Sequence, residues 1–179
     1  MKSYYISVDI EASGPIPGDY SMLSMGMVAV DDPRTTFYVE LKPICDGFIP
    51  EAMQKVGGLT LEGLKQTGTD PKTAMEQCRD WLSSVVPNGY KPVFVAWPAT
   101  FDFMWVHWYF IHFLGSDPFT HSGVDIRSVA MGKLGWHYDR CGKRALADRG
   151  FKSNTRHTHN ALDDAQGQAD IFYSLIRGI

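Results

Sequence analysis

Three strand-like segments with short connections open this chain, and their order restricts the folds that it can adopt. Tyr4–Glu11, Met22–Val30 and Thr35–Lys42 are rich in β-branched and aromatic residues, which favour extended structure. The run Asp31-Asp32-Pro33 is typical of a turn between the second and third segments. Because strands joined by short connections pair side by side, we expect an antiparallel meander at the start of the fold.

After residue 70 the pattern alternates between helix and strand. Apolar residues recur every three or four positions in Pro71–Val85, in 101–113 and in the segment after Asn160, which is the period of a helix facing a core. A short apolar run at Pro92–Trp97 predicts a buried strand, and Val124–Leu134 predicts a short strand followed by a helix. Asn160 is a suitable N-cap for the last helix. We therefore expect an α/β fold, with an irregular, Gly-rich stretch between residues 43 and 70.

Composition indicates one globular domain over residues 1–179. With 179 residues, the chain can bury a sizeable core without structural metals or disulfides. Its net charge of −3 argues against binding nucleic acid mainly through bulk positive charge. Three widely spaced cysteines predict free thiols in a reducing compartment. No run of about 18 apolar residues and no secretory pattern is visible, so we expect a cytoplasmic protein without membrane contact.

Asp9 and Glu11 lie two residues apart in the first predicted strand. Residues at this spacing point to the same face of a strand, while Val8 and Ile10 point to the other. Two neighbouring carboxylates on a core strand repel each other unless a cation lies between them. Oxygen ligands of this kind suit Mg²⁺ or Mn²⁺. The pair alone is equally compatible with two solvated acids at a strand end.

Two further segments carry candidate polar groups. Asp102 lies in the first turn of the aromatic helix that follows a predicted buried strand, where the helix dipole by itself favours a carboxylate. Asp164 lies near the start of the last helix, and His159 lies in the loop just before it. A histidine at such a place suits a general base, although an isolated one is more often a surface residue. Asp163 competes with Asp164 but lies at a capping position.

Together these segments resemble the three exonuclease motifs of the DEDDh family, which includes ribonuclease T, oligoribonuclease and polymerase proofreading subunits. The first motif is matched by VDIEASG at Asp9 and Glu11, and the second by TFDFMW at Asp102. The third is matched by HNALDDA at His159 and Asp164. Each motif alone is weak, but their order and separation also match, and they span nearly the whole chain.

The resemblance implies a metal-dependent 3′→5′ exonuclease with an RNase H-like fold. In this fold a central five-stranded mixed sheet, whose first three strands are antiparallel, is flanked by helices. The resemblance also implies two Mg²⁺ ions, replaceable by Mn²⁺, held by Asp9, Glu11, Asp102 and Asp164. Two such ions can clamp the attacking and leaving oxygens at phosphorus. His159 would be the general base, and the product would be a nucleoside 5′-monophosphate.

Substrate contacts are indicated less directly. By resemblance, the backbone of Ala12 and Ser13 lines the pocket for the terminal nucleotide, and Met22 packs on a base unless it belongs to the core. The family often has a polar residue shortly before Asp102, whereas this chain has the run WPAT at 97–100. That departure concerns how the terminal sugar or a flanking nucleotide is held, and it leaves the metal chemistry unaffected.

The segment 133–159 carries seven basic residues against two acidic ones in a chain that is acidic overall. Such a segment beside an acidic site could follow phosphates, with Trp136 and Tyr138 stacking on bases. A solvated helix face and two packing aromatics are the structural alternative.

These features predict an exonuclease acting on the 3′ ends of single-stranded RNA or DNA, with RNA slightly favoured. Two other functions are compatible with the same fold. One is a nucleic-acid-binding module without catalysis, although such a module has no physical reason to keep repelling carboxylates together with the histidine. The other is a proofreading partner of a separate polymerase. Several relatives are homodimers, so a homodimer is a further prediction.

Overall fold

The computed structural model describes residues 2–155 and 158–178 and contains a five-stranded mixed sheet. The strands are β1 (Lys2–Ala12), β2 (Met22–Ala29), β3 (Asp32–Glu40), β4 (Tyr90–Ala96) and β5 (Gly123–Asp125). Their order in the sheet is β3-β2-β1-β4-β5. The first three strands pair antiparallel, whereas β4 and β5 extend the sheet in parallel with β1. The predicted RNase H-like architecture is thereby confirmed.

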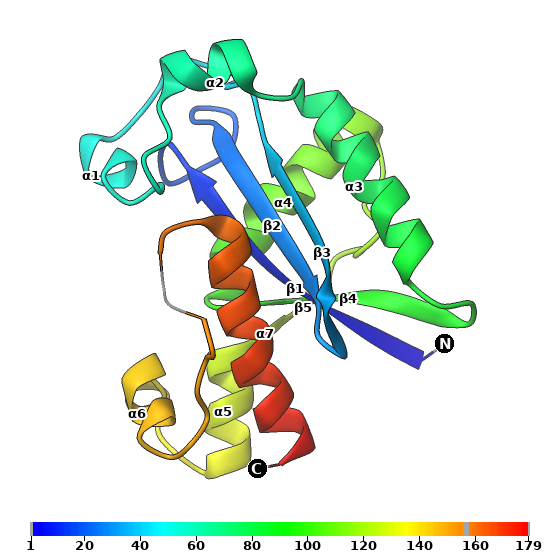
Figure 1. Ribbon diagram of the computed structural model, residues 1–179, viewed down its shortest axis with the longest axis vertical. Helices are drawn as coiled ribbons and strands as arrows, with labels where there is room; N and C mark the ends of the chain where they lie inside the picture. Colours follow the sequence, from blue (N-terminus) through cyan, green and yellow to red (C-terminus); the bar gives the residue numbers. More distant parts are fainter. Residues whose placement is uncertain (1, 156–157, 179) are drawn as a thin grey trace.

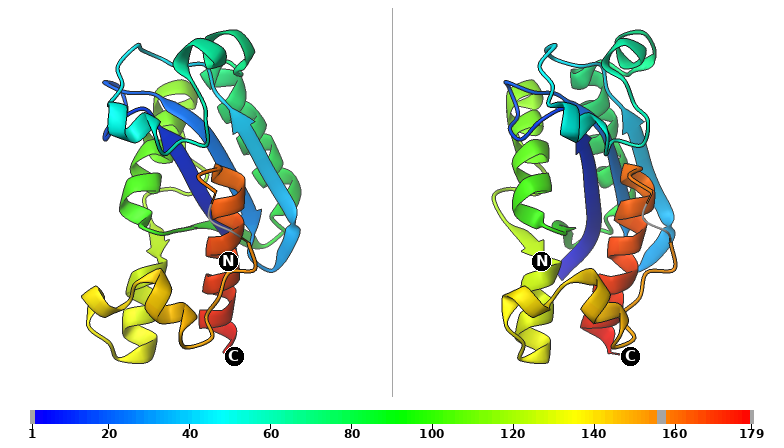
Figure 2. Two further views of the ribbon diagram at one scale, coloured as in Figure 1. Left: turned by 60° about the vertical axis from the view of Figure 1, so that its left-hand side comes forward. Right: turned by 90° about the vertical axis from the view of Figure 1, so that its left-hand side faces the viewer.

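Helices cover both faces of this sheet (Figures 1 and 2). One face carries α3 (Pro71–Val85) and α4 (Ala99–Leu114), and the other carries α5 (Ile126–Leu134) and α7 (Ala161–Arg177). The remaining elements are short: α1 (Pro50–Met53), α2 (Leu61–Thr67), the 3₁₀ helix η1 (Tyr138–Arg140) and α6 (Lys143–Ala147). Each face therefore has its own hydrophobic core, with β1 at the centre of the sheet between them.

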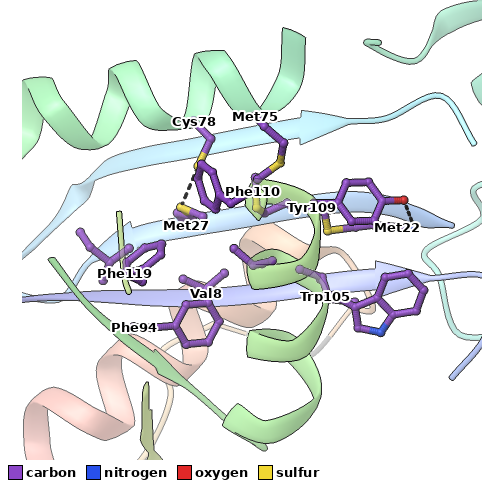
Figure 3. Packing of buried hydrophobic residues seen from close by; sticks show 14 of the residues in the cluster. Val8, Met22, Met27, Met75, Cys78, Phe94, Trp105, Tyr109, Phe110 and Phe119 are labelled. Carbon is purple, nitrogen blue, oxygen red and sulfur yellow. Dashed lines mark hydrogen bonds between the residues drawn. The ribbon is translucent and has the colours of Figure 1, made fainter. Parts of the chain in front are cut away.

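The core beneath α3 and α4 is rich in aromatic and sulfur-containing side chains (Figure 3). Trp105, Tyr109 and Phe110 of α4 are fully buried against the sheet. Val8 and Ile10 of β1 belong to this core, as the alternation of the strand predicts. Asp9 and Glu11 consequently face the other layer, where α7 begins.

Helix boundaries agree with the sequence patterns where local signals are strong. The helix predicted for Pro71–Val85 has those bounds, and the oxygen of Asp70 caps it by accepting from the amides of Lys72 and Thr73. The side chain of Asn160 caps α7, as expected. The third strand begins earlier than predicted, at Asp32, so Asp32 and Pro33 belong to β3 and not to a turn. The stretch predicted to be irregular contains α1 and α2.

Within the described residues, no helix combines the length and the apolar character needed to cross a membrane. The three cysteines are free in the structure, as their spacing predicted.

Candidate active site

The site is built around the end of β1, where Asp9 and Glu11 project toward α7. The register of β1 alternates so that Ser7 also faces α7, and its hydroxyl donates to the carbonyl oxygen of Ala165 at 2.8 Å. The amide nitrogen Nε2 of Gln168 donates to Oδ1 of Asp9 at 2.6 Å. These two bonds anchor the middle of α7 to β1, so the carboxylates of the strand lie beside the start of the helix.

Asp102 reaches the same region from the opposite layer. It lies in the first turn of α4 and is almost fully buried. Its Oδ1 accepts a hydrogen bond from the backbone amide of Ile10 at 3.1 Å. Because Ile10 lies between Asp9 and Glu11, this bond fixes Asp102 directly beside the two strand carboxylates.

The start of α7 supplies Asp164 and His159. Asp164 lies in the first turn of the helix and is buried, and its Oδ1 accepts from the amide of Thr158 at 3.3 Å. His159 is half-buried in the preceding loop and has a φ of 56°, in the left-handed region that non-glycine residues seldom adopt. This backbone conformation turns the chain into the helix and holds the imidazole next to the carboxylates.

Two glycines allow this close approach. Gly26 of β2 pairs with Asp9, and a Cβ at this position would clash with the backbone of Ala161 at the start of α7. Gly57, with a φ of 61°, lies against the carbonyl oxygen of His159, where a Cβ would also clash. The absence of side chains at these positions therefore lets the start of α7 and its preceding loop pack directly on the backbone.

Four of the five predicted catalytic residues line one pocket. Glu11, His159 and Asp164 each offer a ligand atom, and these atoms all lie within 4.8 Å of one another. The same three residues and Asp9 line a pocket of about 400 Å³. Asp102 does not line this pocket, and its connection to the site is the hydrogen bond from the amide of Ile10. Four polar groups from two segments distant in sequence thus border one small volume.

The carboxyl groups in this volume oppose one another electrostatically. Burial raises the pKa of Glu11 to about 8, with further contributions from the charges of Asp164 and Asp102. Burial also raises the pKa of Asp102 to about 7, although its hydrogen bond from Ile10 acts in the opposite direction. The pKa of Asp9 is raised well above its ordinary value by burial and then by Asp102, Glu11 and Asp164. Without a cation, the raised pKa values therefore favour the protonated forms of Asp9, Glu11 and Asp102.

This arrangement fits a divalent metal site. Carboxylate oxygens are the preferred ligands of Mg²⁺ and Mn²⁺, and an imidazole nitrogen within the same 4.8 Å can also coordinate. A bound cation would offset the burial that raises the pKa values of Asp9, Glu11 and Asp102, and also the repulsion that adds to it at Asp9 and Glu11. The donor set and the electrostatics of the pocket therefore both match a cation.

A pH dependence follows from the raised pKa of Glu11. Its ordinary pKa is 4.5, so in the metal-free protein its contribution to stability is fully present below that pH and is lost as the pH rises toward about 8. Since a metal competes with the proton, we expect the increase in melting temperature caused by Mn²⁺ to grow over the same range. Melting curves with Mn²⁺ and with EDTA, at several pH values, would measure this growth. A metal-induced increase independent of pH, or unchanged in Glu11→Gln, would contradict the assignment.

The three predicted substrate-contact residues differ in their accessibility. Ala12 lines the pocket, and its contact with a terminal nucleotide stays a prediction. Ser13 is fully buried, where its hydroxyl donates to the carbonyl of Gly47 at 2.7 Å and accepts from the amide of Ser21. Met22 is also fully buried and belongs to the core shown in Figure 3, where its amide donates to the hydroxyl of Tyr109 at 2.8 Å. In this structure the side chain of Met22 therefore has a packing role.

Several residues of the site were not predicted from the sequence. Gln168 lies one helical turn after Asp164, so its i+4 spacing was a usable signal for the bond to Asp9. Lys143 of α6 lines the pocket, and its positive charge partly counteracts the rise in the pKa of both Asp9 and Asp102. Trp97 and Phe101 form part of the pocket wall. Trp97 falls in the stretch where the resemblance indicated a departure, so an aromatic surface stands close to the expected place of the terminal nucleotide.

A sheet of this topology, with acidic side chains gathered from its first strand and from two helix N-termini, defines a metal-dependent nuclease of RNase H-like fold. No protein-family profile matches the chain. It is 42% identical over 173 residues to the 3′–5′ DNA exonuclease Cap18 of Escherichia coli, which covers 96% of this chain and 90% of the relative. The chain therefore belongs to the DEDDh family of 3′→5′ exonucleases. It is a hydrolase that acts on nucleic acid, and its family depends on divalent metal ions.

Several solved structures share this fold. The nuclease domain of 3′hExo, a DEDDh family member bound to rAMP, superposes with a TM-score of 0.76 at 14% identity, covering 98% of this chain and 92% of that one. Pop2p of S. pombe, in a form with Mg²⁺ and Mn²⁺ bound, gives a TM-score of 0.66 at 15% identity, covering 96% and 82%. At these identities the similarity concerns the fold.

Proposed function

We propose that this exonuclease removes nucleoside 5′-monophosphates one at a time from the 3′ end of single-stranded DNA. Asp9, Glu11, Asp102 and Asp164 would hold two divalent ions, and His159 would be the general base. The observation that carries this assignment is the convergence of Glu11, His159 and Asp164 within 4.8 Å in the pocket that Asp9 also lines.

The protein side chains have separate tasks in this scheme. When bound, two Mg²⁺ or Mn²⁺ ions would supply charge stabilisation to the attacking and departing oxygens at phosphorus. The carboxylates provide oxygen ligands, and Gln168 holds one oxygen of Asp9 in place through its 2.6 Å hydrogen bond. The imidazole of His159 accepts a proton from the attacking water.

The reaction is an in-line displacement at the terminal phosphodiester. The water oxygen forms a bond to phosphorus, and the bond between phosphorus and the 3′ oxygen of the preceding nucleotide breaks. That oxygen leaves with a proton from solvent and becomes the new 3′ end. The backbone at Ala12 borders the pocket and would contact the terminal nucleotide. Trp97 and Phe101 would offer apolar surface to its base.

Several observations support the finer assignments. DNA is favoured because the relative with 42% identity is a DNA exonuclease, whereas the sequence alone had slightly favoured RNA. Support for Mg²⁺ and Mn²⁺ comes from the oxygen-rich donor set and from the ions bound to Pop2p. A homodimer, a polymerase partner and a cytoplasmic location stay predictions, as does a single domain over residues 1–179.

The test is a time course with 5′-labelled single-stranded DNA and RNA of one sequence. Each would be incubated with Mg²⁺, with Mn²⁺ and with EDTA, beside an Asp102→Ala control. We expect a ladder that shortens from the 3′ end, faster for DNA, and no shortening with EDTA or in the control. Faster degradation of RNA would reverse the substrate assignment. No shortening of either polymer in Mg²⁺ or Mn²⁺ would overturn the proposed activity on long single strands.

A further inference from the structure

A second pocket lies beside the proposed active site, on η1, α6 and the loops around them. It has a volume of about 610 Å³, within the range typical of ligand pockets. Its polar lining comes from Trp136, Arg140, Arg144 and Arg149, together with Asp139 and Asp148. We refer to it as the arginine pocket. None of these residues has a role in the chemistry derived above.

The composition of the arginine pocket fits a nucleotide. The guanidinium of Arg149 lies over the indole ring of Trp136, 4.9 Å from the ring centroid. An aromatic plane with arginines around it offers stacking to a base and hydrogen bonds to a phosphate. The two aspartates can accept hydrogen bonds from the amino groups of a base, which a site for a bare anion would not need. A nucleotide therefore matches this lining better than free phosphate does.

A neighbouring aromatic residue extends this surface. Tyr138 of η1 is exposed, and the guanidinium of Arg127 lies 4.1 Å from its ring centroid. The Nε of Arg127 also donates to the carbonyl oxygen of Tyr138 at 2.8 Å, which orients the pair. Arginine–aromatic pairs thus occur both in the arginine pocket and on the element beside it.

The helix α6 links this surface to the active site. Its first residue, Lys143, lines the active-site pocket, and the next residue, Arg144, lines the arginine pocket. The ammonium of Lys143 lies 5.9 Å from the ring centroid of Trp97, which belongs to the active-site wall. In Figure 1, α6 lies near the same end of the molecule as α5, and its Leu146 is buried in the same core as Phe172 of α7. Positive charge therefore continues from one pocket to the other across an anchored helix.

We propose that the arginine pocket binds a nucleotide upstream of the 3′ end that is being cut, so that the single strand crosses α6 between the two pockets. This inference rests on the proposed function, because it assigns the second pocket to the same substrate. It explains how an acidic protein holds a polyanion, because Arg140, Arg144 and Arg149 at the arginine pocket and Lys143 at the active-site pocket lie along the path of the strand. Affinity then depends on strand length, whereas a dinucleotide reaches the active site only.

The test compares a dinucleotide with a dodecanucleotide of DNA. The triple variant Arg140→Ala/Arg144→Ala/Arg149→Ala removes exposed charges, and Arg34→Ala/Arg79→Ala is a control that removes exposed arginines from β3 and α3. Binding of the labelled dodecanucleotide would be measured by fluorescence anisotropy in EDTA, at several salt concentrations. Turnover of both substrates would be measured in Mg²⁺, and melting curves would verify folding.

We expect the triple variant to bind the dodecanucleotide about 10-fold more weakly. The slope of the logarithm of the binding constant against the logarithm of the salt concentration should be smaller in magnitude by roughly 2, because each phosphate contact to a single strand contributes about 0.7 and three arginines are removed. Its kcat/KM for the dinucleotide should equal that of the wild type, and Trp136→Ala should weaken binding of the dodecanucleotide in the same way. Unchanged binding of the dodecanucleotide, or an equal loss for both substrates, would overturn the inference. If the wild type degraded neither substrate, the proposed function would fail, and the anisotropy would still decide whether the arginine pocket binds the strand.

Discussion

Asp164→Asn is expected to lower kcat/KM on single-stranded DNA by more than about 100-fold, the upper end of the loss seen when a group that only supports a metal ligand is removed. The amide keeps the size of the side chain but removes the negative charge that would hold a divalent ion. Asp164 is buried close to Glu11 and His159, so the substitution acts directly on this cluster of ligand atoms. Initial rates with Mg²⁺ and with Mn²⁺ would measure the loss.

The adjacent residue provides a matched control for this variant. Asp163 is half-buried, and its Oδ2 accepts a hydrogen bond from the hydroxyl of Thr158 at 2.7 Å. Asp163→Asn makes the same chemical change one position away and should keep most of the activity and the full stabilisation by metal. An equal loss in Asp163→Asn and Asp164→Asn would show that the start of α7, and not a metal ligand, had been disturbed.

His159→Ala is expected to reduce kcat by about 10²- to 10⁴-fold, the range that a positioned acid or base contributes. The four carboxylates remain in this variant, so Mn²⁺ should still raise its melting temperature. A variant of a carboxylate ligand should lose both its turnover and the increase in melting temperature caused by Mn²⁺. The pair of measurements, turnover and metal-dependent melting, therefore separates a base from a ligand.

The structure makes this separation necessary, because the imidazole of His159 lies within 4.8 Å of the ligand atoms of both Glu11 and Asp164. Abolition of the Mn²⁺-dependent stabilisation in His159→Ala would assign His159 to the metal and not to the proton. His121→Ala, at an exposed histidine, is the control for loss of an imidazole elsewhere, and we expect wild-type turnover from it.

Much of the fold could be predicted from the pattern of residues in the sequence, because that pattern reflects local geometry. The alternation of β1 requires Asp9 and Glu11 to share one face and Val8 and Ile10 to share the other. The cap at Asn160 and the apolar stripe after it define the start and the buried face of α7. Such signals depend on residues a few positions apart, so they can be recognised in the sequence without the tertiary structure.

Short helices could not be predicted in this way. The helices α1 and α2 fall in a stretch predicted to be irregular, and an isolated helix of four or seven residues has little stability of its own. Val56 and Leu64 pack with Leu23 in a small separate core, and this packing stabilises the region. The same limit applies to Met22, whose sequence position was compatible with either the core or a base contact.

The surroundings of the catalytic motifs were decided by the tertiary structure alone. Gln168 and Asp9 are 159 positions apart, and only the packing of α7 on β1 brings them to 2.6 Å. Lys143 reaches the pocket because Leu146 anchors α6 in the core that α7 also covers. Spacing along the chain thus indicated the candidate catalytic residues, whereas their supporting partners and the arginine pocket depend on contacts between distant segments, which local periodicity does not encode.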